Sequence, residues 1–202
     1  MSAAPLSGPR PPRRIDLGGV AVDLLQIGTF RSDAGAIFGP VPRTTWEPLV
    51  HAEIDAASRL LQSLNLLHVQ TSSANLLLET GMLAAGVTQE DEGVHSVSAR
   101  DALLAARIDP DALRYVLPSH LHRDHAGGLV TSSGAAAFPK ATIVAPQAEI
   151  DAVASRSARA RAAYDAPLLQ ALFAESEPEQ FISERQLLPQ VELRLLGGHT
   201  PG

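Results

Sequence analysis

Apolar residues along this chain gather in short runs that are typical of strands. Six such runs, rich in leucine and β-branched residues, are predicted to be strands, at 20–27, 64–69, 75–79, 115–117, 141–145 and 191–196. A Gln-Thr-Ser-Ser turn separates the second run from the third, which favours an antiparallel meander there. With helical segments between the later runs, the pattern indicates an α/β fold.

Helix-start signals lie between the third and fourth strands. Ser98 and Asp101 form a variant of the capping box ahead of a helix at 99–107. Asp109 is then expected to cap a short turn that has Pro110 at its first helical position. This turn leads directly into the strand at 115–117.

Two more helices are expected in the second half of the chain, at about 147–164 and at 167–175. The first carries a modest basic face, which we interpret as a solvated surface rather than a binding patch (Arg156, Arg159 and Arg161). An acidic linker follows the second helix (Glu175, Glu177 and Glu179). The linker then leads to the strand at 191–196.

The first 14 residues are rich in Pro, Ser, Gly and Arg and show no apolar periodicity, which predicts a disordered tail at 1–14 and one domain at 15–202. Arg13 and Arg14 resemble a twin-arginine export signal, but charges and glycines interrupt the segment that follows. No segment reaches the roughly 18 continuous apolar residues that a membrane span needs. We therefore expect a cytoplasmic protein with no membrane partner.

Composition narrows the chemistry that the chain can perform. With 202 residues, 45% of them hydrophobic, the chain is long enough for one good-sized globular domain. It has no cysteine, so any metal must be held by His, Asp and Glu. The formal net charge of −6 argues against a nucleic-acid partner, which would need a basic face. A small-molecule substrate is the expected partner.

The densest group of potential metal ligands directly follows the predicted strand at 115–117. It contains His120, His122, Asp124 and His125, four candidates within six positions. In an extended segment residues two apart point the same way, so His120 and His122 can bind one cation while Asp124 and His125 reach a second position. Two glycines follow and let the backbone turn tightly. Packing does not explain such a cluster, and its ligand types suit zinc, iron or manganese.

Two motifs in the chain resemble those of the metallo-β-lactamase-fold hydrolases. Residues 120–125 match the HxHxDH signature, and residues 198–202 resemble the GHTPG turn that supplies that family's next histidine, here His199. The resemblance implies a four-layer αββα sandwich in which His120, His122 and His199 hold one zinc ion and leave a fourth position for water.

The same resemblance implies a second metal position begun by Asp124 and His125, so that one or two zinc ions are expected. Asp124 is the predicted catalytic residue, because it would orient or deprotonate the attacking water. A metal-bound water has a pKa of about 7 and can act as a nucleophile. The predicted reaction is hydrolysis of a small ester, lactone, thioester or amide.

Two shorter segments also resemble parts of that family. The predicted loop at 28–46 resembles the GAMFGVVPKxxW segment of a subgroup that includes predicted quorum-quenching lactonases. Phe38 and Trp46 would then wall the metal cleft, unless the segment is an ordinary surface loop with a hydrophobic anchor. Glu79-Thr80-Gly81 resembles the family's Asp-Thr-Gly element, whose acid supports the ligand loop by hydrogen bonding. The extra methylene of Glu79 can misplace this contact, or the usual strand has been lost, because 82–93 shows no strand pattern.

The resemblance also implies that family members continue well past the GHTPG turn. Beyond it they supply an aspartate that bridges the two metals, a further histidine and much of the second half of the sandwich. We therefore expect a truncated chain that lacks ligands at its second metal position. Its first sheet would keep an exposed apolar face, through which the chain would self-associate.

Several alternatives stay open at the level of sequence. The chain could be a mononuclear iron dioxygenase-type member of the same fold, or a catalytically inactive fragment that only binds metal. His68, alone on an apolar strand, is interpreted as structural. A catalytic triad of Ser119, His120 and Asp124 is disfavoured, because neighbours in sequence rarely reach triad geometry.

Overall fold

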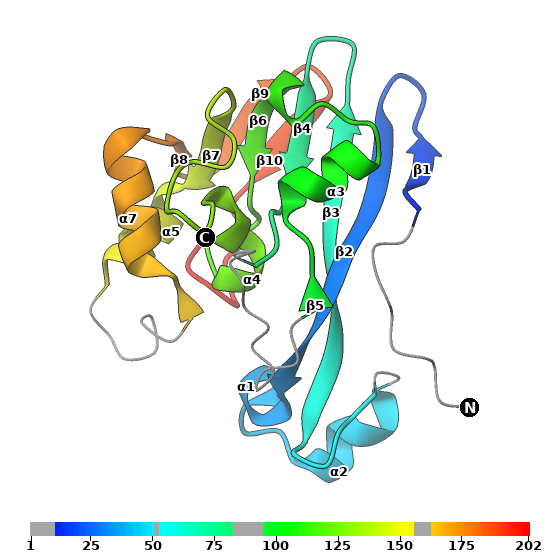
Figure 1. Ribbon diagram of the computed structural model, residues 1–202. Helices are drawn as coiled ribbons and strands as arrows, with labels where there is room; N and C mark the ends of the chain where they lie inside the picture. Colours follow the sequence, from blue (N-terminus) through cyan, green and yellow to red (C-terminus); the bar gives the residue numbers. More distant parts are fainter. Residues whose placement is uncertain (1–10, 51–52, 83–94, 156–162) are drawn as a thin grey trace.

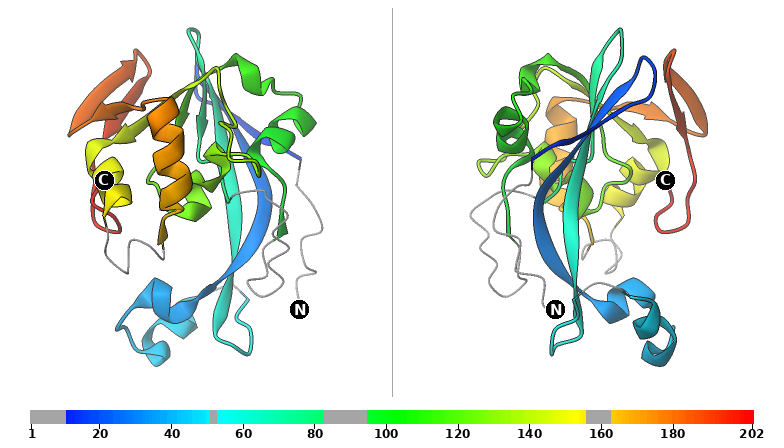
Figure 2. Two further views of the ribbon diagram at one scale, coloured as in Figure 1. Left: turned by 60° about the vertical axis from the view of Figure 1, so that its left-hand side comes forward. Right: turned by 90° about the vertical axis from the view of Figure 1, so that its right-hand side faces the viewer.

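A single large sheet forms the centre of the computed structural model, which describes residues 11–50, 53–82, 95–155 and 163–202. Helices pack on one face of this sheet, and a two-stranded hairpin packs on part of the other face (Figures 1 and 2). The described chain therefore has a layer of helices on one side of the large sheet and a small second sheet on the other. In the described part of the chain, these layers correspond to three of the four layers of the expected αββα sandwich.

The sheet runs in the order β1-β2-β3-β4-β6-β7-β8, with β5 paired to β2. Its strands are β1 (Arg13–Asp16), β2 (Ala21–Asp33), β3 (Arg59–Gln70), β4 (Asn75–Leu78), β5 (His95–Ser96), β6 (Leu113–Leu117), β7 (Thr142–Pro146) and β8 (Glu179–Phe181). Strands β2, β3 and β4 pair antiparallel, which confirms the predicted meander. Strands β4, β6, β7 and β8 run parallel, so their carboxyl ends share one edge of the sheet.

The helix layer is held by an apolar core. It consists of α3 (Ala99–Ala105), α4 (Arg123–Ala126), α5 (Gln147–Ala154) and α7 (Ala166–Glu175), with the short 3-10 turns η2 (Pro110–Ala112) and η3 (Gly127–Leu129). Large side chains from the sheet and the helices interlock there with almost no exposure, among them Ile27, Leu66, Leu77, Leu103, Leu121 and Leu169. Burial of such side chains is the main favourable term in folding.

Two helix starts agree with the sequence analysis. The Ser98 hydroxyl accepts a hydrogen bond from the backbone N–H of Asp101 at the start of α3. The Asp109 carboxylate accepts one from the N–H of Asp111, with Pro110 at the first position of η2. Each cap satisfies a backbone donor that the helix itself leaves free.

The second sheet in the described part of the chain is a hairpin of β9 (Glu184–Leu188) and β10 (Val191–Arg194). It covers the far face of the parallel strands through a small apolar cluster of Leu76, Tyr115, Leu117, Val144 and Leu188. Further along that face, the side chains of β2 and β3 stay partly exposed, namely Val22, Leu24, Leu67 and Val69. The expected apolar surface is therefore present, while self-association through it stays a prediction.

Several predicted boundaries are wrong, among them the ends of the helix at 99–107 and of the strand at 191–196, which stop at Ala105 and Arg194. The helix expected at 147–164 ends at Ala154, because Ser155 takes extended backbone angles, and the predicted basic face (Arg156, Arg159 and Arg161) lies outside the described residues. The predicted acidic linker ends before Glu179, because Glu179 begins β8 and forms an ion pair with Arg185 of β9. Arg13 and Arg14 of the predicted tail lie in β1, where Arg14 binds Asp23 of β2.

The segment after β2 is folded rather than a loop. Strand β2 continues to Asp33, whose side chain caps α1 (Ala34–Phe38), and α2 (Arg43–Trp46) and η1 (Glu47–Leu49) follow. These short helices lie at one end of the long β2–β3 ribbon (Figure 1). The rings of Phe38 and Trp46 stack there with centroids 4.4 Å apart. Among the described helices, none combines the length and the apolar character needed to cross a membrane.

Candidate metal centre

The candidate ligands lie at the edge of the sheet where the parallel strands end. The loop carrying His120 and His122 follows β6, Glu79 follows β4, and the turn carrying His199 follows the hairpin strand β10. Open α/β sheets place their sites beyond the carboxyl ends of the strands, because loops from neighbouring strands meet there. Sequence reasoning located this edge correctly from the run of apolar residues before His120.

Three histidines converge at this edge. His120, His122 and His199 each offer a ring nitrogen, and these nitrogens all lie within 4.8 Å of one another. Nδ1 of His122 and Nε2 of His199 are 3.1 Å apart. Two nitrogens bound to one tetrahedral zinc ion, each at 2.0–2.1 Å, are about 3.4 Å apart, so this pair nearly has the spacing of ligands.

The environment of His120 also fits a metal ligand. Its Nε2 is buried and has no hydrogen-bond partner among the described residues, a costly state for a polar atom that a bound cation would relieve. Its Nδ1 lies 3.0 Å from the Ser119 hydroxyl, which can fix the ring. Burial, together with the charges of His125 and His122, lowers the pKa of His120 to about 4. The imidazole is therefore neutral at pH 7, the form that binds metal.

The surroundings of His122 also favour the neutral imidazole. Burial and the neighbouring His199 lower the pKa of His122 below its usual value. Its ring also packs edge-on against Tyr164, with centroids 4.7 Å apart. The three residues that sequence analysis assigned to the first metal position are thus brought together, and they fit a zinc site with an open fourth position.

Asp124 and His125 lie beside this group at the start of the short helix α4. Oδ2 of Asp124 is 3.3 Å from Nε2 of His125. Burial raises the pKa of Asp124, but the hydrogen bond and charge of His125 outweigh burial and hold that pKa below its usual value. Burial lowers the pKa of His125, whereas Asp124 and Glu79 raise it more strongly, to about 9. The Asp124 carboxylate is therefore ionised at neutral pH.

Glu79 makes the hydrogen bonds that support the ligand loop, although its side chain is one methylene longer than the aspartate of the family's Asp-Thr-Gly element. Its Oε2 lies 3.0 Å from Nδ1 of His125, and its Oε1 accepts a hydrogen bond from the N–H of Ser119 at 3.1 Å. The neighbouring Thr80 donates both its N–H and its hydroxyl to the carbonyl of His125. The alternative of a lost strand after Gly81 concerns 82–93, most of which lies outside the described residues.

Sequence analysis missed Glu149. This residue is fully buried, and its carboxylate accepts hydrogen bonds from the N–H of Leu121 and of Gly202, both at 2.9 Å. It therefore touches both loops that carry the three histidines. A signal was present, because Glu149 lies one helical turn before buried Val153 and so occupies the apolar face of α5.

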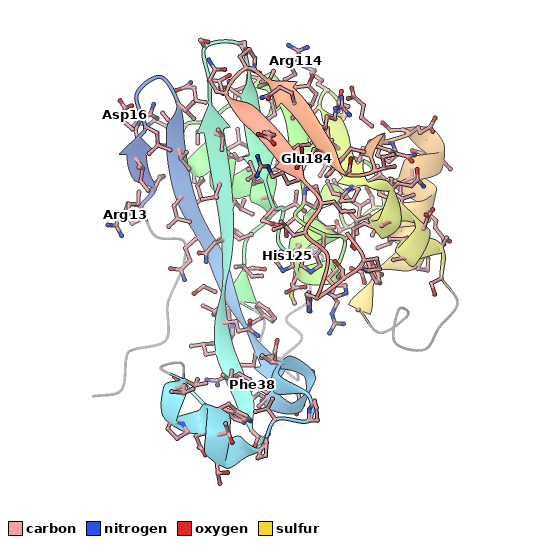
Figure 3. The ribbon with its side chains drawn as sticks, turned by 180° about the vertical axis from the view of Figure 1, so that it is seen from behind. Arg13, Asp16, Phe38, Arg114, His125 and Glu184 are labelled. Carbon is pink, nitrogen blue, oxygen red and sulfur yellow. The ribbon has the colours of Figure 1, made fainter. Side chains whose placement is uncertain are left out.

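A cavity of about 420 Å³ opens beside His120 and His199. Most of its lining is apolar, from the parallel strands and the β9–β10 hairpin, with Leu78, Leu117, Val144, Phe181, Val191 and Leu193. Phe38 and Trp46 do not line it. They pack with Ala34 and Leu60, and Figure 3 shows Phe38 in the helical segment at one end of the ribbon, below His125. The hydrophobic-anchor interpretation of residues 35–46 is therefore the one that the structure supports.

Two further histidine interpretations can be compared with the geometry. Nδ1 of the buried His68 lies 3.0 Å from Asp23, in the sheet and apart from the three-histidine group, which agrees with a structural role. A triad would need an acid on the free nitrogen of His120. In the described part of the chain this Nε2 has no partner, and Asp124 contacts His125 instead. Ser119, His120 and Asp124 do not form a triad.

The fold and the site together define an α/β protein whose loops converge on a metal-binding group of histidines. Residues 65–202 match the family described as the metallo-beta-lactamase superfamily, and the chain belongs to that family. This confirms the resemblance inferred from the HxHxDH and GHTPG motifs. A comparison with curated proteins gave no significant match.

Several solved structures share the fold. A probable metal-dependent hydrolase from Staphylococcus aureus has a TM-score of 0.78 and 24% identity, and the alignment covers 93% of this chain and 68% of that one. AidC, a dizinc quorum-quenching lactonase, has a TM-score of 0.69 and 21% identity over 95% and 68% of the two chains. An N-acyl homoserine lactone hydrolase has a TM-score of 0.64 and 21% identity over 96% and 69%.

Proposed function

We propose that this chain is a metal-dependent hydrolase that uses a metal-activated water on a small ester, lactone or related carbonyl substrate. The observation that carries this proposal is the convergence of His120, His122 and His199. The Nε2 of His120 is buried and, within the described ranges, makes no hydrogen bond. Three neutral nitrogens are a typical protein ligand set for catalytic zinc. Membership of the metallo-beta-lactamase superfamily supports the same reaction class.

Each residue then has a role that its surroundings support. His120, His122 and His199 would hold the zinc ion, which when bound supplies a water of lowered pKa and polarises a carbonyl group. Asp124 is ionised and lies beside the histidines, so it can orient a water or accept its proton. His125, held by Glu79, keeps the Asp124 carboxylate in place. It would begin a second metal position only by releasing the ring proton that a pKa of about 9 gives it at pH 7.

The cavity supports a substrate with an apolar portion. Its apolar walls would bind a hydrocarbon group, while His120 and His199 at its end would face the carbonyl. A lactone belongs among the first test compounds, because two of the similar structures are of lactone-cleaving enzymes. Short-chain esters are the natural comparison, since they offer the same carbonyl chemistry without the ring.

The test combines metal analysis with an activity assay. We expect about one zinc per chain by elemental analysis, and hydrolysis of a lactone or ester that stops when a chelator removes the metal. His199→Ala should lose both the zinc and the activity. His95→Ala is the matched control, because His95 is exposed and lies outside the three-histidine group, and it should keep both.

Other outcomes would contradict the proposal. Stoichiometric zinc without turnover of any ester or lactone would remove the hydrolytic function and leave a metal-binding fragment. Stoichiometric iron would instead favour a mononuclear iron dioxygenase-type member of the same fold. Zinc that stays bound in His199→Ala would place the metal elsewhere in the chain.

A further inference from the structure

The buried carboxylate of Glu149 joins the two loops that carry the metal ligands. Its Oε2 accepts a hydrogen bond from the N–H of Leu121, which lies between His120 and His122 in sequence. Its Oε1 accepts one from the N–H of Gly202, three residues after His199. One side chain on α5 therefore binds backbone N–H groups in both segments that carry the three histidines.

Close packing around Glu149 makes this connection specific. A Cβ atom on Gly202 would lie 2.5 Å from Cγ of Glu149 and 3.0 Å from Cβ of Pro146, so only glycine lets the backbone approach this closely. The Tyr164 hydroxyl donates to Oε2 of Glu149 at 3.3 Å, and the Tyr164 ring packs against His122. The position of the carboxylate is thus coupled to that of His122 in two ways, through the backbone of Leu121 and through the side chain of Tyr164.

The charge of Glu149 is stabilised by these donors. Burial raises the pKa of Glu149, but hydrogen bonds from the N–H of Leu121, the hydroxyl of Thr200 and the N–H of Gly202 outweigh burial and lower the pKa below its usual value. An ionised carboxylate has only acceptor positions, so it can satisfy an N–H on each oxygen at the same time. A neutral side chain of the same shape cannot do so.

We propose that Glu149 is a positioning residue that fixes the distance between the His120–His122 loop and the His199 turn. This inference rests on the metal site of the proposed function. His122 and His199 lie 3.1 Å apart. In the described part of the chain, the two segments that carry them both donate a backbone N–H to Glu149, and the inference follows from this shared acceptor. Outer groups that orient metal ligands typically change metal affinity about 10–100-fold when they are removed.

The substitution Glu149→Gln tests this role with little change of volume. The glutamine amide keeps one acceptor oxygen, but its NH₂ group would face a backbone N–H donor and release one of the two loops. Val153→Ala is the matched control, because Val153 is equally buried on the same helix and belongs to the apolar core. It should lower stability by loss of packing without touching either loop.

The measurement is the zinc dissociation constant of the full chain, obtained by competition with a chromophoric chelator. For Glu149→Gln we expect about a 10–100-fold weaker zinc affinity, with circular dichroism showing a folded protein. The visible spectrum of the cobalt-substituted protein should also change, since it reports the geometry of the ligands. Val153→Ala should melt at a lower temperature yet keep the zinc affinity and cobalt spectrum of the unsubstituted chain.

A folded Glu149→Gln protein with unchanged zinc affinity and cobalt spectrum would overturn the inference. So would an equal loss of affinity in Val153→Ala, because it would show that general stability sets the affinity. A different result would contradict the proposed function alone. In that case Glu149→Gln would still weaken zinc binding, but the unsubstituted chain would hydrolyse no ester or lactone. An unsubstituted chain that binds no zinc would overturn both.

Discussion

Oε2 of Glu79 lies 3.0 Å from Nδ1 of His125, while the other oxygen of the same carboxylate binds the N–H of Ser119. Glu79 follows β4 and Ser119 follows β6, so one side chain connects the ends of two neighbouring parallel strands. A carboxylate on the outer nitrogen of a histidine fixes the tautomer that presents the other nitrogen to a metal. Glu79 therefore supports the ligand loop at Ser119 and His125, whereas Glu149 binds the same loop at Leu121.

Glu79→Ala should accordingly weaken metal binding. Without these two hydrogen bonds, His125 and the start of the ligand loop can rotate, and we expect about a 10–100-fold loss of zinc affinity, measured by chelator competition. Glu47→Ala is the control, because Glu47 lies on the distant α2–η1 segment and, within the described part of the chain, pairs with Arg43. Equal zinc affinity in the two variants would show that Glu79 does not support the site.

Phe38 and Trp46 provide a test of whether the α1–α2 segment takes part in catalysis. Trp46 is the only tryptophan of the chain, so its fluorescence reports on this cluster. Phe38→Ala removes the stacked ring, and we expect a red-shifted emission and a stability loss of about 1–3 kcal/mol in chemical denaturation. Zinc affinity should not change. A large fall in kcat/KM with unchanged zinc content would instead place this segment at the substrate.

Asp23 should stabilise the sheet without affecting the metal. Its carboxylate accepts from Arg14 of β1 and contacts Nδ1 of buried His68 on β3. Asp23→Ala leaves a buried imidazole nitrogen without its partner, which should cost about 1–3 kcal/mol of unfolding free energy. Asp16→Ala, in the exposed β1, should cost much less. Loss of zinc on removal of Asp23 would contradict the structural interpretation of His68.

Glu149 should also make the free energy of unfolding depend on pH in the acid range. Because its pKa in the folded chain is below the usual 4.5, its contribution to stability is complete above that pH and is lost as the pH falls through the folded-state pKa. We expect the difference in unfolding free energy between the unsubstituted chain and Glu149→Gln, measured without metal, to be largest near neutral pH. It should shrink below pH 4.5. A difference independent of pH would show that ionisation of Glu149 does not matter.

Local signals predicted much of this molecule correctly. The β2–β3–β4 meander, the cap at Ser98 and the ligand loop after β6 follow from apolar runs and from residue types at fixed spacing. These features depend on residues close together in sequence, so a pattern of a few positions carries them. The group of His120, His122 and His199 was reached only by adding a family resemblance, since no local pattern joins two such distant loops.

The features that sequence reasoning missed depend on tertiary contacts. Strand β8 contains Glu179 and Gln180, and it forms because it can pair with the edge of β7. The role of Glu149 depends on two backbone amides from distant loops, which its own helix does not reveal. Phe38 and Trp46 have the composition of a pocket wall, but they pack with Ala34 and Leu60 and do not line the cavity beside His120.

The separation of 77 positions between His122 and His199 also bears on the order in which the chain folds. During synthesis His120 and His122 leave the ribosome well before His199, and two imidazoles alone hold zinc weakly. Contacts between distant segments form late, because a long loop must close first. Zinc in the three-histidine site would therefore stabilise only chains whose β9–β10 hairpin has already docked, and cellular zinc would favour the finished fold over its intermediates.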